Sequence, residues 1–116
     1  MMQETMLRIK LAEYNSLPVG AGQAVTVNGE NIVLFRISNG EVKAVENRSP
    51  HRKGGTLADA LVSGKFIYCP VYDLKISLED GKVQAPDTGE VKTYHVEAIE
   101  NEVYITIYDL RGGTSL

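Results

Sequence analysis

Short runs of alternating or β-branched apolar residues, separated by turn residues, make up most of this 116-residue chain. Residues 7–11 alternate between apolar and polar side chains, and the later runs are rich in the β-branched and aromatic residues that favour strands. The predicted strands are residues 7–11, 23–27, 32–37, 41–45, 65–69, 74–78, 93–99 and 103–107, with a short return at 82–83. The pattern therefore predicts an antiparallel all-β domain.

Turn residues predict how the first strands connect. Asn28-Gly29 favours the positive backbone angles of a two-residue hairpin turn, and Ser38-Asn39-Gly40 supplies the next turn. Strands 23–27, 32–37 and 41–45 are therefore expected to form a meander.

Length and composition predict one domain over residues 1–107. The hydrophobic content of 43% is enough for a single core in a chain of this size. Residues 108–116 contain Gly112-Gly113 and show no periodicity, so we expect a flexible tail there.

Charge, apolar run length and cysteine content exclude several classes of protein. The net charge of −3 gives no broad basic field for nucleic acid. No apolar stretch approaches the roughly 18 residues of a membrane helix, and residues 1–5 carry no apolar run with a cleavage site. The single cysteine, Cys69, cannot form an internal disulfide. We therefore expect a cytoplasmic protein that binds neither nucleic acid nor a membrane.

The strand pattern stops between residues 46 and 64. Only residues 57–62 indicate local order there, and they are predicted to form a helical turn. A loop of this length in a small domain is typical of a functional segment. The loop holds a basic cluster in an acidic chain: Arg48, His51, Arg52 and Lys53. Such a cluster is either a solvated loop or a surface that docks onto an acidic patch of a partner.

Two short stretches carry candidate ligand positions, Ser49-Pro50-His51 and Cys69-Pro70-Val71-Tyr72. A two-iron two-sulfur site of the Rieske type needs two thiolates and two imidazoles, arranged as Cys-x-His and Cys-x-x-His. Here Ser49 replaces one thiolate and Tyr72 replaces one imidazole. Serine is a poor substitute for thiolate, and tyrosine binds borderline metals badly unless it is ionised. We therefore expect no 2Fe-2S cluster, and no catalytic, cofactor-binding or metal-binding residue in this chain.

The resemblance to Rieske proteins extends over nearly the whole chain, up to residue 107. Residues 47–57 (NRSPHRKGGTL) look like the first cluster loop, with one residue more than usual between the histidine and the glycine pair. Residues 68–73 (YCPVYD) look like the second loop, and 74–83 (LKISLEDGKV) resemble the strand and turn that follow it. Residues 86–96 (PDTGEVKTYHV) are similar to the small subunit of assimilatory NAD(P)H-dependent nitrite reductase, a Rieske-like family.

This resemblance implies a Rieske-type (ISP-like) antiparallel β-sandwich with two remnants of cluster loops. It also implies a partner, the nitrite reductase large subunit, which carries siroheme, FAD and a 4Fe-4S cluster. That subunit binds the nicotinamide cofactor and reduces nitrite to ammonium in nitrate assimilation. The chain itself would then be a non-catalytic accessory subunit of an oxidoreductase, docking through Arg48, Arg52 and Lys53.

Two other functions are compatible with the same sequence. One is a Rieske-type ferredoxin that carries electrons to an oxygenase, and the other is a stand-alone binding or regulatory module that kept the fold. The number of remaining ligands argues against the ferredoxin.

The retained ligand residues also have purely structural roles available. Two donors hold a metal weakly, since a stable site needs about four. His51 is expected to hydrogen-bond within its loop, and Cys69 to pack as a small apolar residue. His95 lies on a predicted strand and is expected at the surface. Tyr72 is expected to fill the space of the absent cluster and to tie the two loops through its hydroxyl.

Overall fold

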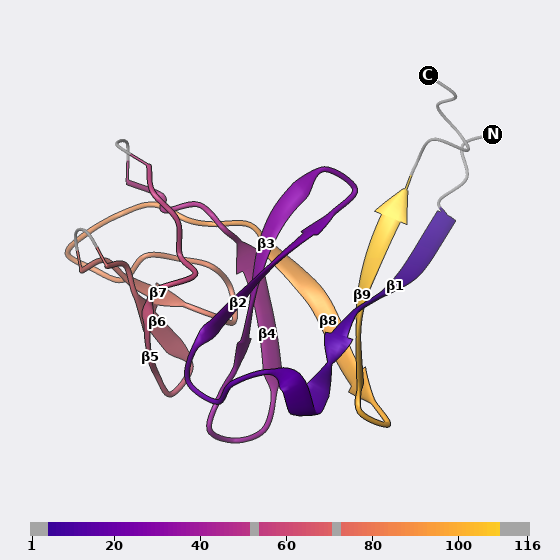
Figure 1. Ribbon diagram of the computed structural model, residues 1–116. Coiled ribbons are helices and arrows are strands. Elements are labelled where there is room, and N and C mark those ends of the chain that lie inside the picture. The colour runs from indigo at the N-terminus through magenta and orange to yellow at the C-terminus, as the bar shows by residue number, and fades with distance from the viewer. Residues whose placement is uncertain (1–4, 52–53, 71–72, 110–116) are drawn as a thin grey trace.

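The computed structural model describes residues 5–51, 54–70 and 73–109, and these form an all-β fold (Figure 1). The elements are β1 (Thr5–Glu13), the 3-10 turn η1 (Tyr14–Ser16), β2 (Gly22–Val27), β3 (Glu30–Arg36), β4 (Val42–Glu46), β5 (Leu61–Ser63), β6 (Phe66–Tyr68), β7 (Lys75–Ser77), β8 (Thr93–Ile99) and β9 (Glu102–Asp109). Within these ranges no helix is long and apolar enough to cross a membrane. The predicted all-β antiparallel class is confirmed.

β2, β3 and β4 form the predicted meander. Asn28 and Gly29 both have positive φ, 51° and 79°, which is the geometry that matches a tight turn to the twist of its strands. The turn sets Val27 opposite Glu30. β3 then pairs with β4 in an unbroken register.

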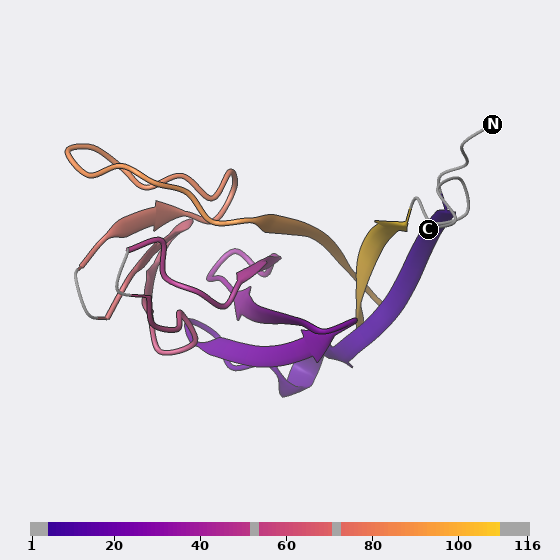
Figure 2. The same ribbon diagram turned by 90° about the horizontal axis from the view of Figure 1, so that it is seen from above.

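A six-stranded sheet has the order β1-β9-β8-β4-β3-β2. β4 and β8 share only two register positions, Ala44 with Tyr94 and Val45 with Thr93. Beyond this short junction, β8, β9 and β1 bend away from the meander (Figures 1 and 2). Buried residues of the two halves, among them Ile32, Val103 and Ile105, form one core between them.

β3 is buried on both faces, because its side chains alternate between two cores. Ile32 and Leu34 belong to the core shared with β9. Val33 and Phe35 belong to a second core that includes residues of the small sheet β5-β6-β7 and of the loops around it. The candidate site loops are therefore built against the opposite face of the same strand.

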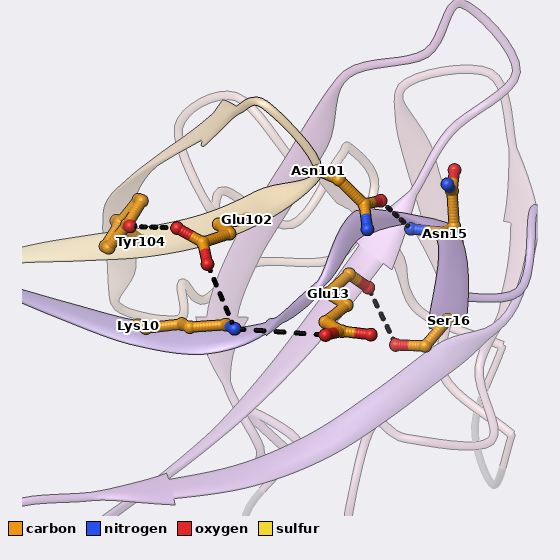
Figure 3. A network of polar contacts seen from close by, with 7 residues as sticks. All are labelled: Lys10, Glu13, Asn15, Ser16, Asn101, Glu102 and Tyr104. Atoms are coloured by element: carbon orange, nitrogen blue, oxygen red, sulfur yellow. Dashed lines mark hydrogen bonds and ion pairs between the residues drawn. The ribbon is translucent and has the colours of Figure 1, made fainter.

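The turn between β8 and β9 fastens the end of β1 (Figure 3). Asn101, at φ 70°, accepts a hydrogen bond on its Oδ1 from the backbone N–H of Asn15 at 2.8 Å. Glu102 accepts a hydrogen bond from Lys10 Nζ at 3.2 Å and another from the hydroxyl of Tyr104. These contacts hold the β1–β9 ribbon in register at the end where β1 leaves the sheet.

Some sequence-based boundaries were wrong. The helical turn predicted over residues 57–62 does not form; a single turn bond joins Ala60 N–H to Leu57 O at 3.0 Å, and strand β5 follows it. The predicted return at 82–83 makes isolated bridges rather than a strand. β9 continues to Asp109, two positions beyond the predicted strand end at residue 107. Residues 110–116 lie outside the described residues, and a flexible tail there stays a prediction.

Candidate functional site

The two candidate loops meet through Ser49 and Cys69. Ser49 Oγ lies 3.2 Å from Cys69 Sγ, within hydrogen-bond distance for a sulfur atom, and either atom can donate. The exposed fractions of the two residues are 2% and 0%. Ser49 follows β4 and Cys69 directly follows β6, so the fold brings together the two positions that the sequence pattern assigns to thiolates.

The first loop is closed by its own backbone. Ser49 N–H donates to Gly55 O at 2.8 Å, and Gly54 N–H donates to His51 O at 2.7 Å. His51 N–H donates to Ser49 Oγ at 3.2 Å. Gly54 and Gly55 have φ of 76° and 108°, a region that side-chain-bearing residues rarely adopt. The glycine pair therefore lets the loop turn back on itself. His51 bonds within the loop through its backbone N–H and C=O, and the predicted role of its imidazole stays a prediction.

Asn47 anchors both ends of this loop, a role that the sequence pattern did not indicate. Its Oδ1 accepts hydrogen bonds from Leu57 N–H at 2.8 Å and from Ala58 N–H at 3.1 Å. Its own N–H donates to Asn31 O at 2.9 Å. An asparagine at a strand end is a known cap for nearby backbone groups, but the N–H groups that donate to it here lie ten and eleven positions away in sequence.

The second loop turns tightly after β6. Cys69 N–H donates to Leu74 O, and Asp73 N–H donates to Cys69 O, both at 2.9 Å. Asp73 has φ of 52°, in the left-handed region. Cys69 belongs to the core beside β3, so its predicted packing as a small apolar residue is confirmed. Tyr72 lies outside the described residues, and its role as a tie between the loops stays a prediction.

Arg48 and His51 line a recess beside the first loop. The recess has a volume of about 260 Å³ and is lined by Glu46, Arg48, Ser49, Pro50, His51 and Glu90. A second recess of about 320 Å³ shares Glu46 and Arg48 with it. Arg48 is exposed. Of the three predicted docking residues, Arg52 and Lys53 lie outside the described residues, so the structure places only Arg48.

A carboxylate–phenol pair lines the second recess. The Tyr94 hydroxyl donates to Glu30 Oε1 at 2.5 Å, and Lys92 Nζ lies 3.0 Å from the same oxygen. The hydrogen bond from Tyr94, followed by that from Lys92, lowers the pKa of Glu30. Burial, followed by the bond to Glu30, raises the pKa of Tyr94. The proton therefore stays on the phenol and the charge on the carboxylate, an arrangement that ties β3 to β8.

The described residues do not supply the donors that a 2Fe-2S cluster of the Rieske type requires, two thiolates and two imidazoles. At the predicted positions they provide one imidazole at His51, one thiol at Cys69 and one hydroxyl at Ser49. Among them, no group of three or more histidine, cysteine, aspartate or glutamate side chains is placed to hold a metal ion. His95 is on β8 with its side chain 67% exposed, 3.7 Å from Glu97, as expected for a surface residue.

Comparison with known proteins matches residues 9–106 to the model of the Rieske-like 2Fe-2S domain family. The 3-phenylpropionate/cinnamic acid dioxygenase ferredoxin subunit of Photorhabdus laumondii is 28% identical over 103 residues, covering 88% of this chain and 96% of the ferredoxin. The cholesterol 7-desaturase nvd of Xenopus laevis is 29% identical over 104 residues, covering 72% of this chain. This chain spans only 23% of the length of that desaturase.

Solved structures give the same architecture. A protein assigned as the small subunit of an NADPH nitrite reductase has a TM-score of 0.77 and 25% identity, covering 85% of this chain and 97% of that chain. A protein from Mycobacterium tuberculosis, assigned as the small subunit of an NADH-dependent nitrite reductase, has a TM-score of 0.80 and 22% identity, covering 89% and 96%. The predicted Rieske-type fold and the predicted resemblance to these small subunits are confirmed. The chain belongs to the Rieske-like 2Fe-2S domain family.

Proposed function

We propose that this chain is a cluster-free small subunit of a cytoplasmic NAD(P)H-dependent nitrite reductase. It docks onto a large subunit that carries siroheme, FAD and a 4Fe-4S cluster and reduces nitrite to ammonium. The observation that carries the proposal is the similarity to the NADPH nitrite reductase small subunit, 25% identical and covered over 97% of its length. Co-purification from the native organism tests it, because a siroheme-containing partner is expected to accompany the chain. Recovery of the chain without a siroheme protein would contradict this function.

The absence of a cluster is supported by the chemistry of the two loops. A cluster of this type needs two thiolates on one iron, and the chain has one cysteine. That cysteine is buried and lies within hydrogen-bond distance of the Ser49 hydroxyl. We expect freshly purified protein to contain no iron and to show no visible absorption or electron paramagnetic resonance signal of a reduced cluster. Two irons and two acid-labile sulfides per chain would overturn the proposal.

Docking is assigned to the basic first loop, through Arg48, Arg52 and Lys53. Arg48 is exposed on the rim of two recesses, where its charge is available to a partner's carboxylates. Opposite charges across an interface mainly raise the association rate and are screened by salt.

Reversing the three charges to glutamate is expected to weaken binding to the large subunit at low salt, with a smaller effect at high salt. Lys65→Glu is the control for reversing one such charge elsewhere on the surface, because Lys65 lies in the β5–β6 turn and pairs at the surface with Glu79. Equal binding of the charge-reversed variant and the control would contradict docking through this loop.

A second candidate is a ferredoxin that carries electrons to an oxygenase. It is favoured by the 28% identity to the dioxygenase ferredoxin subunit over 96% of that protein. Electron transfer requires a bound cluster, so the same metal analysis and spectra separate the two candidates. A cluster signal would favour the ferredoxin, and its absence would exclude it.

A further inference from the structure

The two edges of the six-stranded sheet differ in their protection against pairing. β1, at one edge, carries Arg8, Lys10 and Glu13 and has a shift in register in its middle. Charged side chains and bulges are the usual devices that stop a sheet edge from pairing with another chain. β2, at the other edge, has neither: residues 18–29 contain no charged side chain, and the register of β2 with β3 is unbroken. β2 is therefore an open edge.

The hairpin turn decides which backbone groups of β2 face outward. In a two-residue turn the flanking residues, Val27 and Glu30, form a hydrogen-bonded pair, and such pairs alternate along an antiparallel ladder. Gly22, Ala24 and Thr26 therefore direct their N–H and C=O groups away from β3.

The contacts of this edge agree with that assignment. Ala24 O accepts a hydrogen bond from the Gln23 side-chain amide at 3.4 Å, so this carbonyl is accessible. Among the described residues, no backbone group outside the ladder with β3 bonds to Gly22, Ala24 or Thr26. Ala24 and Thr26 are exposed and small, so their side chains leave room for an incoming strand.

We propose that two copies of this chain associate through β2, antiparallel, about a two-fold axis at Ala24. In this register Gly22 pairs with Thr26 of the second copy, Ala24 pairs with Ala24, and Thr26 pairs with Gly22. Each outward-facing residue of β2 then has a hydrogen-bonded partner, whereas a shift by two residues leaves part of the edge unpaired.

A second copy is the occupant that the charges favour, because two uncharged strands meet without like-charge repulsion. The contact is isologous and closed: it uses the β2 edge of each copy, and the edge of each six-stranded sheet that remains outside is the charged β1. Association is therefore expected to stop at the dimer. A single strand pair buries little surface, which is typical of weak complexes.

Analytical ultracentrifugation from about 10 μM to about 1 mM, a range suited to weak complexes, tests the proposal. We expect the weight-average mass to rise from that of a monomer, 12.7 kDa, toward twice that value. Ala24→Lys places two lysines opposite each other at the axis and is expected to abolish the rise. Ser38→Lys, which adds the same charge to the exposed β3–β4 turn, is expected to leave it unchanged. A constant monomer mass, or a dimer insensitive to Ala24→Lys, would overturn the proposal.

Cysteine cross-linking tests the register itself. Residues directly opposite in a hydrogen-bonded pair have Cα atoms about 5.5 Å apart, within the range of a disulfide. Cys69 is buried, so Ala24→Cys adds an accessible thiol to a chain that has no other. We expect mild oxidation to convert Ala24→Cys to a covalent dimer at least ten times faster than Ser38→Cys. Equal rates for the two variants would refute an axis at Ala24.

Discussion

Removing the side chain of Asn47 is expected to loosen the first loop at both ends. Asn47→Ala deletes the oxygen that accepts from the N–H groups of Leu57 and Ala58. Leu57 is 0% exposed, so its N–H cannot turn to water, whereas Ala58 is only partly buried. A buried donor left without a partner costs about 1–3 kcal/mol, and an ordinary hydrogen bond contributes about 1 kcal/mol. Together the two losses amount to about 3 kcal/mol.

For a domain of this size, about 3 kcal/mol corresponds to a fall of about 12 °C in melting temperature. Urea denaturation followed by far-ultraviolet circular dichroism measures the free energy of unfolding, and a thermal melt gives the temperature. Asn47→Asp is the matched control, because it keeps an acceptor oxygen at the same position and is expected to retain most of the stability. The reasoning is refuted if Asn47→Ala unfolds within about 0.5 kcal/mol of the wild type, or if Asn47→Asp loses as much as Asn47→Ala.

Three further substitutions test separate parts of the structure. Ser49→Cys places a second thiol beside the native buried one, so oxidation is expected to form a disulfide across 20 residues that adds about 3 kcal/mol of stability; mass spectrometry showing two free thiols after oxidation would contradict this. Gly81→Ala is expected to cost more than 2 kcal/mol, because φ is 76° and the added Cβ would lie 2.1 Å from a backbone oxygen. Gly64→Ala, with φ of 59° and open space around it, is its control and is expected to cost about 1 kcal/mol in the same denaturation assay; equal losses would count against the steric argument. The hydrogen bond from Tyr94 lowers the folded-state pKa of Glu30 below its ordinary value of 4.5. The ionised Glu30 carboxylate therefore stabilises the fold at pH values above 4.5, and this stabilisation is lost as the pH falls through the lowered pKa. Glu30→Gln is therefore expected to flatten the acid limb of the stability profile, and an unchanged limb would be evidence against the pair.

The first half of the fold could be predicted from local chemistry. Asn28-Gly29 has the backbone preference that its turn requires, and the residues on either side have the β-branched character of strands. β5 was not predicted, because it has only three residues and one of them, Leu61, is an exposed apolar residue, so it shows no alternating pattern. A segment that short becomes a strand only when a neighbour, here β6, offers its backbone groups. The predicted ends of β9 were also wrong, because where β9 begins and ends depends on its pairing with β1 and not on its own residues.

The sequence by itself determined the antiparallel all-β class and the kinds of donor atom at the two loops, because both follow from residue type and spacing along the chain; the Rieske-type fold entered as a resemblance of its motifs. Only the tertiary structure decided which side chains meet. Ser49 reaches Cys69 across 20 positions, and Tyr94 reaches Glu30 across 64. Contacts of that separation depend on how strands pair and sheets pack, which no local pattern specifies. The open edge of β2 depends on both the sequence and the fold. Its lack of charge is visible in the sequence, whereas its place at the end of the sheet is a property of the fold.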